Sequence, residues 1–135
     1  MLDELTIWPI ENIPGADSVF MRAHESYFRD GDLQPGVFTS KEGPGMSVDW
    51  DKYSSKEQTR QRARKPEKNA VIRLSVDGIR KIDQLDVAHR PEPDNRAHSE
   101  VDLPTDESLT EIRFKLNRLA KTVIPLTATK PATQY

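Results

Sequence analysis

The sequence predicts an α+β fold, in which a small, mainly antiparallel sheet of five to six short strands is covered by a C-terminal amphipathic helix. Three observations support this prediction. Several short segments alternate apolar and polar residues, as half-buried strands do. Pairs of Gly, Pro, Asn and Asp residues separate these segments and are typical of turns. After Thr105, apolar residues recur at spacings of three and four, which indicates a helix that buries one side.

The composition indicates a small core and much irregular chain. Apolar residues make up 35% of the 135 residues, charged residues make up 31%, and there are ten prolines. The formal net charge of −2 argues against a surface built entirely for nucleic acid. Because the chain has no cysteine, disulfides, thiolate metal sites and cysteine nucleophiles are excluded.

The sequence contains no apolar run approaching the roughly 20 residues that span a bilayer, and its first residues are acidic rather than a signal peptide. We therefore expect a cytoplasmic protein with no membrane partner. The expected organisation is an extended N-terminal arm over residues 1–17, one α+β domain over residues 18–124, and a tail over residues 125–135.

The first half of the domain is expected to contain three strands. Residues 18–24 alternate, with Val19 and Met21 on one side and Arg22 and His24 on the other. A turn of helix and a loop follow, and shorter strands are predicted over residues 37–40 and 46–50.

The middle of the chain predicts a polar surface helix followed by strands. Ser54 and Glu57 form a capping-box pattern at the start of that helix, and Pro66 ends it. The strands expected after it cover residues 69–76, 84–90 and 96–101.

The last element is an amphipathic helix over residues 106–123, with Asp106 in its first turn and Lys121 in its last. A strand over residues 110–116 is the alternative, because the apolar residues there also alternate.

Arg22 and His24 are the first candidates for chemistry. Two residues apart on a strand, they project from the same face about 7 Å apart. An arginine can hold a phosphate, and a neighbouring histidine can transfer a proton. The alternative is an edge strand whose polar side chains face water.

Two later segments contribute further candidates. Ser47 follows the glycine-rich turn of the segment "EGPGMSVDW", whose backbone amides could cradle an anion, although a simple hairpin turn would look the same. His98 could act as a general acid or base, with Asn95 orienting it or binding a carbonyl group. Alternatively, Asn95 only closes the turn and His98 only packs at the sheet edge.

A basic run over residues 56–68 is the one concentration of positive charge, and it could contact a nucleic-acid backbone. A solvated surface helix is the commoner explanation for such a run. The three histidines lack tight ligand spacing, so we expect neither a metal site nor a cofactor. The nucleic-acid candidates are Arg60, Arg62, Arg64 and Lys65.

The segments "VFMRAHESYF", "GVFTSKEGPGMSVDW" and "RPEPDNRAHSEV" resemble those of a widespread set of small bacterial proteins that share G-x-S-V and N-x-A-H segments. This resemblance implies a compact α+β fold and brings no established activity. The order of an Arg/His strand, a Ser segment and a later polar strand is also similar to ADP-ribosyltransferase-like folds, including the RNA 2′-phosphotransferases. Because the chain lacks their Gln/Glu-x-Glu and H-x-x-R patterns, that similarity does not imply the use of NAD.

Two functions follow as hypotheses. The first is a small bacterial accessory protein that binds a protein partner, in a multi-component defence or toxin-type system. A Trp-bearing N-terminal arm, a proline-rich loop and a proline-bounded tail look like parts that become ordered against something else. The second is a phosphate-handling enzyme or nucleotide-binding module that acts on a nucleotide or RNA through Arg22, His24, Ser47 and His98. Convergence of these side chains in one pocket would favour the second.

Overall fold

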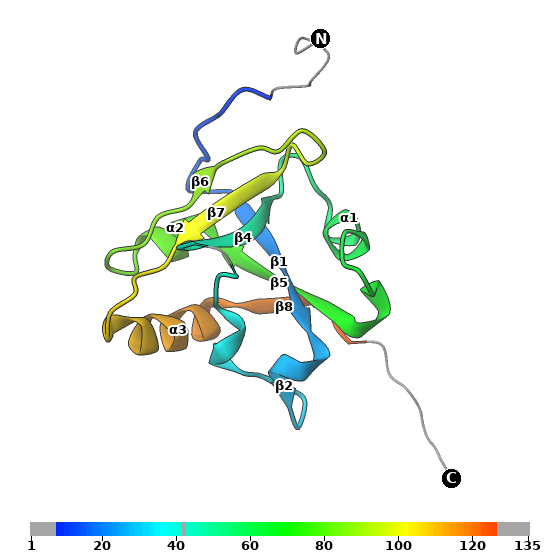
Figure 1. Cartoon of the computed structure of the whole chain (residues 1–135), viewed down its shortest axis with the longest axis vertical. Helices are drawn as coiled ribbons and strands as arrows, with labels where there is room; N and C mark the ends of the chain where they lie inside the picture. The colour runs from blue at the N-terminus through cyan, green and yellow to red at the C-terminus, as the bar shows by residue number, and fades with distance from the viewer. Residues whose placement is uncertain (1–7, 42, 127–135) are drawn as a thin grey trace.

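The fold is built around a six-stranded antiparallel sheet, which a computed structural model describes over residues 8–41 and 43–126. The order of its strands is β6-β7-β4-β1-β5-β8 (Figure 1). The α+β class predicted from the sequence is therefore confirmed. The strands are β1 (Ser18–His24), β4 (Gly45–Trp50), β5 (Asn69–Ser75), β6 (Ala88–His89), β7 (His98–Asp102) and β8 (Lys121–Ile124).

One face of the sheet carries the apolar core. On β1, Val19, Met21 and Ala23 are buried and face the same way, as their alternation predicted. Helices α2 (Val76–Arg80) and α3 (Ser108–Leu119) lie on this side of the sheet (Figure 1). Ile112 and Leu116 of α3 belong to the same buried cluster, so the predicted C-terminal helix does cover the sheet.

The opposite face of the sheet is polar and is covered only near one end, by α1 (Lys56–Gln61) (Figure 1). A capping box starts this helix: the Ser55 side chain accepts a hydrogen bond from the Gln58 amide, and the Gln58 side chain accepts one from the Ser55 amide. The cap therefore lies one residue after the predicted Ser54 and Glu57 pair. Ser54 is instead buried, and its hydroxyl lies 2.9 Å from that of Thr59.

Three predicted elements are wrong in kind or in extent. The strand expected over residues 37–40 does not form, because Val37 ends the 3-10 helix η3 (Pro35–Val37) and Phe38 then turns into the core. The strand expected over residues 84–90 is reduced to the two residues of β6. The helix expected to continue to residue 123 ends at Leu119, and the chain then forms β8.

Shorter elements connect the sheet strands. The 3-10 helix η2 (Glu25–Tyr27) leads into a hairpin made of β2 (Phe28–Arg29) and β3 (Asp32–Leu33). Its two turn residues, Asp30 and Gly31, both have positive φ, as a tight two-residue hairpin turn requires. The 3-10 helix η4 (Pro66–Lys68) precedes β5.

The described part of the N-terminal arm packs on the rest of the chain. Ile13 belongs to the core, and its carbonyl accepts a hydrogen bond from Arg80. The Arg96 guanidinium lies between the rings of Trp8 and Tyr53, 4.7 and 4.1 Å from their centres. Residues 1–7 of the predicted arm and residues 127–135 of the predicted tail lie outside the described residues.

The Glu11 carboxylate fixes the arm to this cluster. It accepts hydrogen bonds from the Tyr53 hydroxyl at 2.5 Å and from Lys52 Nζ at 2.9 Å, and Arg96 lies 3.6 Å away. The Tyr53 and Lys52 hydrogen bonds lower the pKa of Glu11 from 4.5 to about 2. The ionised carboxylate thus stabilises the folded state.

We expect Glu11→Gln to reduce the acid sensitivity of folding. A carboxyl group whose folded pKa is depressed adds stability above its unfolded pKa of 4.5, and this contribution is lost as the pH falls toward the folded value of about 2. The free energy of unfolding, measured by urea denaturation from about pH 6 to about pH 2.5, should therefore fall less steeply in the variant. Glu57→Gln, at an exposed position on α1, should leave the slope of the native chain unchanged. A difference between Glu11→Gln and the native chain that stays constant over this pH range would contradict the prediction.

Candidate functional site

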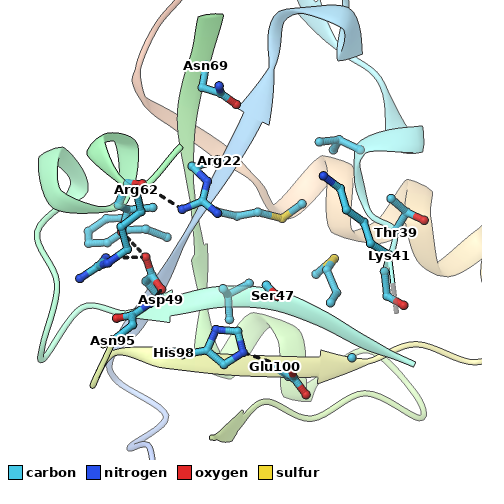
Figure 2. Close-up of a pocket in the computed structure, with 18 of the residues that line it drawn as sticks. Arg22, Thr39, Lys41, Ser47, Asp49, Arg62, Asn69, Asn95, His98 and Glu100 are labelled. Carbon is cyan, nitrogen blue, oxygen red and sulfur yellow. Dashed lines mark hydrogen bonds and ion pairs between the residues drawn. The ribbon is translucent and has the colours of Figure 1, made fainter. Parts of the chain in front are cut away.

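The polar face of the sheet is hollowed by a cavity of about 680 Å³, which we call the polar pocket. Its walls are β1, β4 and β7, the α1 helix, residues 39–41 after η3, and the turn at residues 92–95. Figure 2 shows its main side chains. The residues that the sequence singled out are brought together here, since Arg22, His24, Ser47, Asn95 and His98 all line the pocket.

The pocket lies where two adjacent strands of the sheet, β1 and β4, separate. β1 pairs with β5 along all seven of its residues but with β4 only at Val19 and Phe20. Beyond Phe20 the two strands diverge, and the cavity reaches between them to side chains of the core face, including Met21 and Met46. The pocket therefore combines a polar rim with an apolar floor.

Asp49 organises the wall between β4 and α1. Its side chain is only 7% exposed and accepts hydrogen bonds from Arg62 and Thr59, both at 2.8 Å, and from Asn95 at 2.9 Å. Arg62 also donates to the Ser54 hydroxyl at 3.0 Å. This network ties α1 and the 92–95 turn to the sheet.

Asn95 is therefore a structural residue of the turn. Its amide nitrogen donates to Asp49, and its side-chain oxygen accepts from the backbone of Ala97 at 3.1 Å. Neither contact is to the His98 ring, so Asn95 does not orient His98 directly. The alternative weighed from the sequence, that Asn95 closes the turn, agrees with these contacts.

His98 stands on β7 with its ring in the pocket. The residue is 9% exposed, and its Nε2 lies 3.1 Å from a carboxylate oxygen of Glu100. Figure 2 shows the other ring nitrogen, Nδ1, facing the interior of the pocket. Its nearest ionic neighbour is a carboxylate oxygen of Glu92 at 3.8 Å, which is too far for a hydrogen bond.

Arg90 holds the Glu100 carboxylate from the other side. Arg90 donates to Glu100 at 2.6 Å and forms a two-pronged pair with Asp102 at 2.8 and 2.9 Å. These interactions, the Arg90 hydrogen bond first among them, lower the pKa of Glu100. An ionised Glu100 fixes the orientation of the His98 ring, as carboxylates do for catalytic histidines.

Two cationic side chains face the cavity from the other wall. Arg22 donates one hydrogen bond to the Thr59 carbonyl at 3.1 Å and, within the described residues, is paired with no carboxylate. In Figure 2, Lys41 extends toward Arg22 across the pocket. Lys41 too has no ion-pair partner in the described part of the chain, and sequence reasoning missed it because it lies in an irregular segment.

Ser47 and His24 differ in their availability. Ser47 is exposed on the pocket side of β4, and its hydroxyl has no hydrogen-bond partner among the described residues. His24 uses its Nδ1 to cap η2, accepting from the Ser26 amide at 3.1 Å. Since it lies four residues along β1 and two strands away from His98, its backbone is about 15 Å from that of His98. The two histidines therefore stand at opposite ends of the pocket.

The basic run is partly turned inward. Arg60 donates to the Asn69 carbonyl at 3.1 Å, and Arg62 is held by Asp49. Of the four residues predicted to contact a nucleic-acid backbone, Arg60 and Arg62 thus have guanidinium groups that bind other parts of the chain. Arg64 and Lys65 lie beyond α1 and do not line the pocket.

Comparisons with known proteins add nothing to this geometry, since no family model, curated protein or solved structure matches the chain. The resemblances noted on short segments therefore stay predictions. Within residues 8–41 and 43–126, no helix is long and apolar enough to cross a membrane.

Proposed function

We propose that this protein is a phosphate-handling enzyme whose polar pocket binds a phosphate-bearing small molecule and transfers a proton on it. Arg22 and Lys41 would hold the phosphate, Ser47 would donate a hydrogen bond to it, and His98 would be the general base. The observation that carries the proposal is that two cations without a carboxylate partner in the described chain face the same cavity as a histidine held by Glu100.

The charges support an anionic ligand on the Arg22 side. Asp49 is neutralised by Arg62, and Glu100 by Arg90. Neither carboxylate therefore competes for Arg22 or Lys41. A doubly charged phosphate between these two cations would be bound by charge-assisted hydrogen bonds, which are the stronger kind.

Proton transfer is supported by the orientation of His98. With Nε2–H donating to Glu100, Nδ1 carries the lone pair that a base needs and faces the cavity. Glu100 would stabilise the imidazolium that forms when Nδ1 accepts a proton. General-base catalysis requires a base and a group that orients it. His98 would be the base here, and Glu100 would orient it.

We expect the double variant Arg22→Ala, Lys41→Ala to lose at least about tenfold in affinity for inorganic phosphate, because each removed charge-assisted hydrogen bond contributes about 1.5–3 kcal/mol. Isothermal titration calorimetry at low salt is the measurement. The matched control is Arg29→Ala, Lys81→Ala, which removes the same two charges from exposed positions outside the pocket. The control should bind phosphate like the native chain. Equal losses in both double variants would point to a general charge effect and would contradict the proposed site.

The protein-partner function has less support from the surface. Among the described residues, the large apolar side chains that are strongly exposed are Ile10 and Phe114, and they lie on separate elements, the arm and α3. The Trp8 and Ile13 side chains of the arm pack within the chain itself. A binding partner stays a prediction, and copurification from a native host would test it.

A further inference from the structure

We propose that the phosphate-bearing ligand of the polar pocket is a sugar phosphate, whose hydroxyl groups lie against His98 and Glu92. The inference rests on the proposed phosphate site at Arg22 and Lys41 and concerns the opposite side of the same pocket. That side carries the unpartnered Nδ1 of His98 and two carboxylates of the 92–95 turn, Glu92 and Asp94.

The His98 ring nitrogen is the first observation. More than nine-tenths of the residue is buried, yet Nδ1 faces the cavity without a hydrogen bond among the described residues. This nitrogen is therefore open to a hydrogen-bonding group of a ligand in the pocket. A hydroxyl group fits, because it donates to a neutral imidazole nitrogen and accepts from a protonated one.

The Glu92 carboxylate is the second observation. It accepts no hydrogen bond from the described residues, and its side chain is 54% exposed at the pocket rim. The turn that carries it is rigid: Glu92 and Asn95 exchange both backbone hydrogen bonds at 3.0 Å, Pro91 and Pro93 flank Glu92, and Asn95 is tied to Asp49. A carboxylate can only accept hydrogen bonds, and its two oxygens match the two donors of neighbouring sugar hydroxyls, as they do for ribose in dinucleotide-binding folds.

The distance between the two ends of the pocket calls for an extended ligand. Phe20, Asp49 and His98 are paired in register on three adjacent strands, and Arg22 lies two residues further along β1. Strand spacing and rise then place the Cα atoms of Arg22 and His98 about 12 Å apart. The two residues therefore stand at opposite ends of one cavity. A single ligand can contact both only through two polar groups that are several ångströms apart, as the phosphate and the ring hydroxyls of a sugar phosphate are.

The two ends also explain why the pocket is not uniformly basic. A cationic end and an acidic end would bind neither a bare polyanion nor a simple cation well. A molecule with an anionic group at one end and hydroxyl donors at the other satisfies both. Proton abstraction by His98 would then act on a sugar hydroxyl: the O–H bond breaks, Nδ1 gains the proton, and the oxygen keeps the electron pair.

The test compares two phosphate monoesters of similar length, ribose 5-phosphate and n-butyl phosphate, by calorimetric titration of the whole chain. We expect ribose 5-phosphate to bind about tenfold or more tightly, since only it supplies hydroxyl donors. Glu92→Ala should remove most of that advantage while leaving n-butyl phosphate binding unchanged or slightly stronger. Glu67→Ala, at a position outside the pocket, should preserve the advantage.

The outcomes separate the two proposals. Equal binding of both esters, or an advantage that survives Glu92→Ala, would overturn the sugar-phosphate inference and leave the phosphate site intact. Absence of binding by either ester and by inorganic phosphate would overturn both. Because Glu92 is exposed and its turn is held by backbone hydrogen bonds, the variant should fold, and an unchanged circular dichroism spectrum would verify this.

Discussion

Asp49→Ala is expected to lower the free energy of unfolding by about 3 kcal/mol and to abolish ligand binding in the polar pocket. Removing one member of a buried, hydrogen-bonded charge pair costs about 3–5 kcal/mol, because the remaining charge loses its partner. We place the effect at the lower end, about 3 kcal/mol, since the Arg62 side chain is 30% exposed and can regain some water. Thr59 and Asn95 would also lose their acceptor.

Urea denaturation of Asp49→Ala and Arg62→Ala, singly and combined, would measure this effect. The double variant should be less destabilised than the sum of the two single variants, because the second substitution removes the charge that the first leaves unpaired. Asp83→Ala removes a carboxylate from an exposed position and serves as the control, with a change within about 0.5 kcal/mol. Additive effects at positions 49 and 62 would mean that the pair contributes nothing as a pair.

His98→Gln is expected to reduce turnover by a factor of about 10²–10⁴, the usual contribution of a positioned acid or base. The amide can still reach Glu100 but cannot accept a proton at the position of Nδ1. Affinity for inorganic phosphate should stay within about threefold of native, because charge-assisted bonds to Arg22 and Lys41 supply most of it. Conversion of phosphate esters, ribose 5-phosphate first, would be followed by chromatography of the substrate and its product.

His24→Gln is the matched control for this experiment, since both histidines line the pocket but only His98 is held by a carboxylate. It should retain turnover within a few-fold of native. An equal loss in the two variants would contradict the separate roles assigned to them. If the native chain binds phosphate esters and converts none of them, the catalytic part of the proposal fails and the binding part stands.

The sequence predicted well those strands that have one buried face and one polar face. In these strands apolar and polar residues alternate. In β1, Val19 and Met21 face the core while Arg22 faces the pocket, so the period of two is visible in the residues themselves. In β7, His98 and Glu100 share the polar face for the same reason. For α3 the sequence left a strand open as the alternative, since Ile112, Phe114 and Leu116 also alternate. The structure forms the helix, with Ile112 and Leu116 buried and Phe114 exposed on the other side.

Tertiary contacts determine the structure of the segments that the sequence did not predict correctly. The apolar spacing of α3 continues to Val123, yet the chain leaves the helix at Ala120 and pairs with β5, where Lys121 is opposite Arg73. Two cations at neighbouring positions give no local indication of a strand. Likewise, Phe38 looks like part of an alternating strand but fills the core after a 3-10 turn, with its carbonyl accepting from Arg113.

The pocket could be predicted only in part. Arg22, Ser47 and His98 are polar residues on strands, and period-two patterning gives their direction. Lys41, Glu92 and Arg62 lie on irregular segments or at a helix end, so their directions depend on packing that no local pattern encodes. Asn95 was chosen for its chemistry, but its acceptor, Asp49, is 46 residues away.

The short pairing between β1 and β4 affects where the sheet opens locally in the folded state. Only Val19 and Phe20 join the two strand triplets in register at the centre of the sheet, whereas β1 and β5 are paired over seven residues and β4 and β7 over five. A seam with few interstrand amide bonds opens at a lower free energy than the ladders on either side, so its amide protons exchange with solvent first. We therefore expect the sheet to open first along this line beside the cavity, where a small rotation of one triplet against the other would change the width of the cavity.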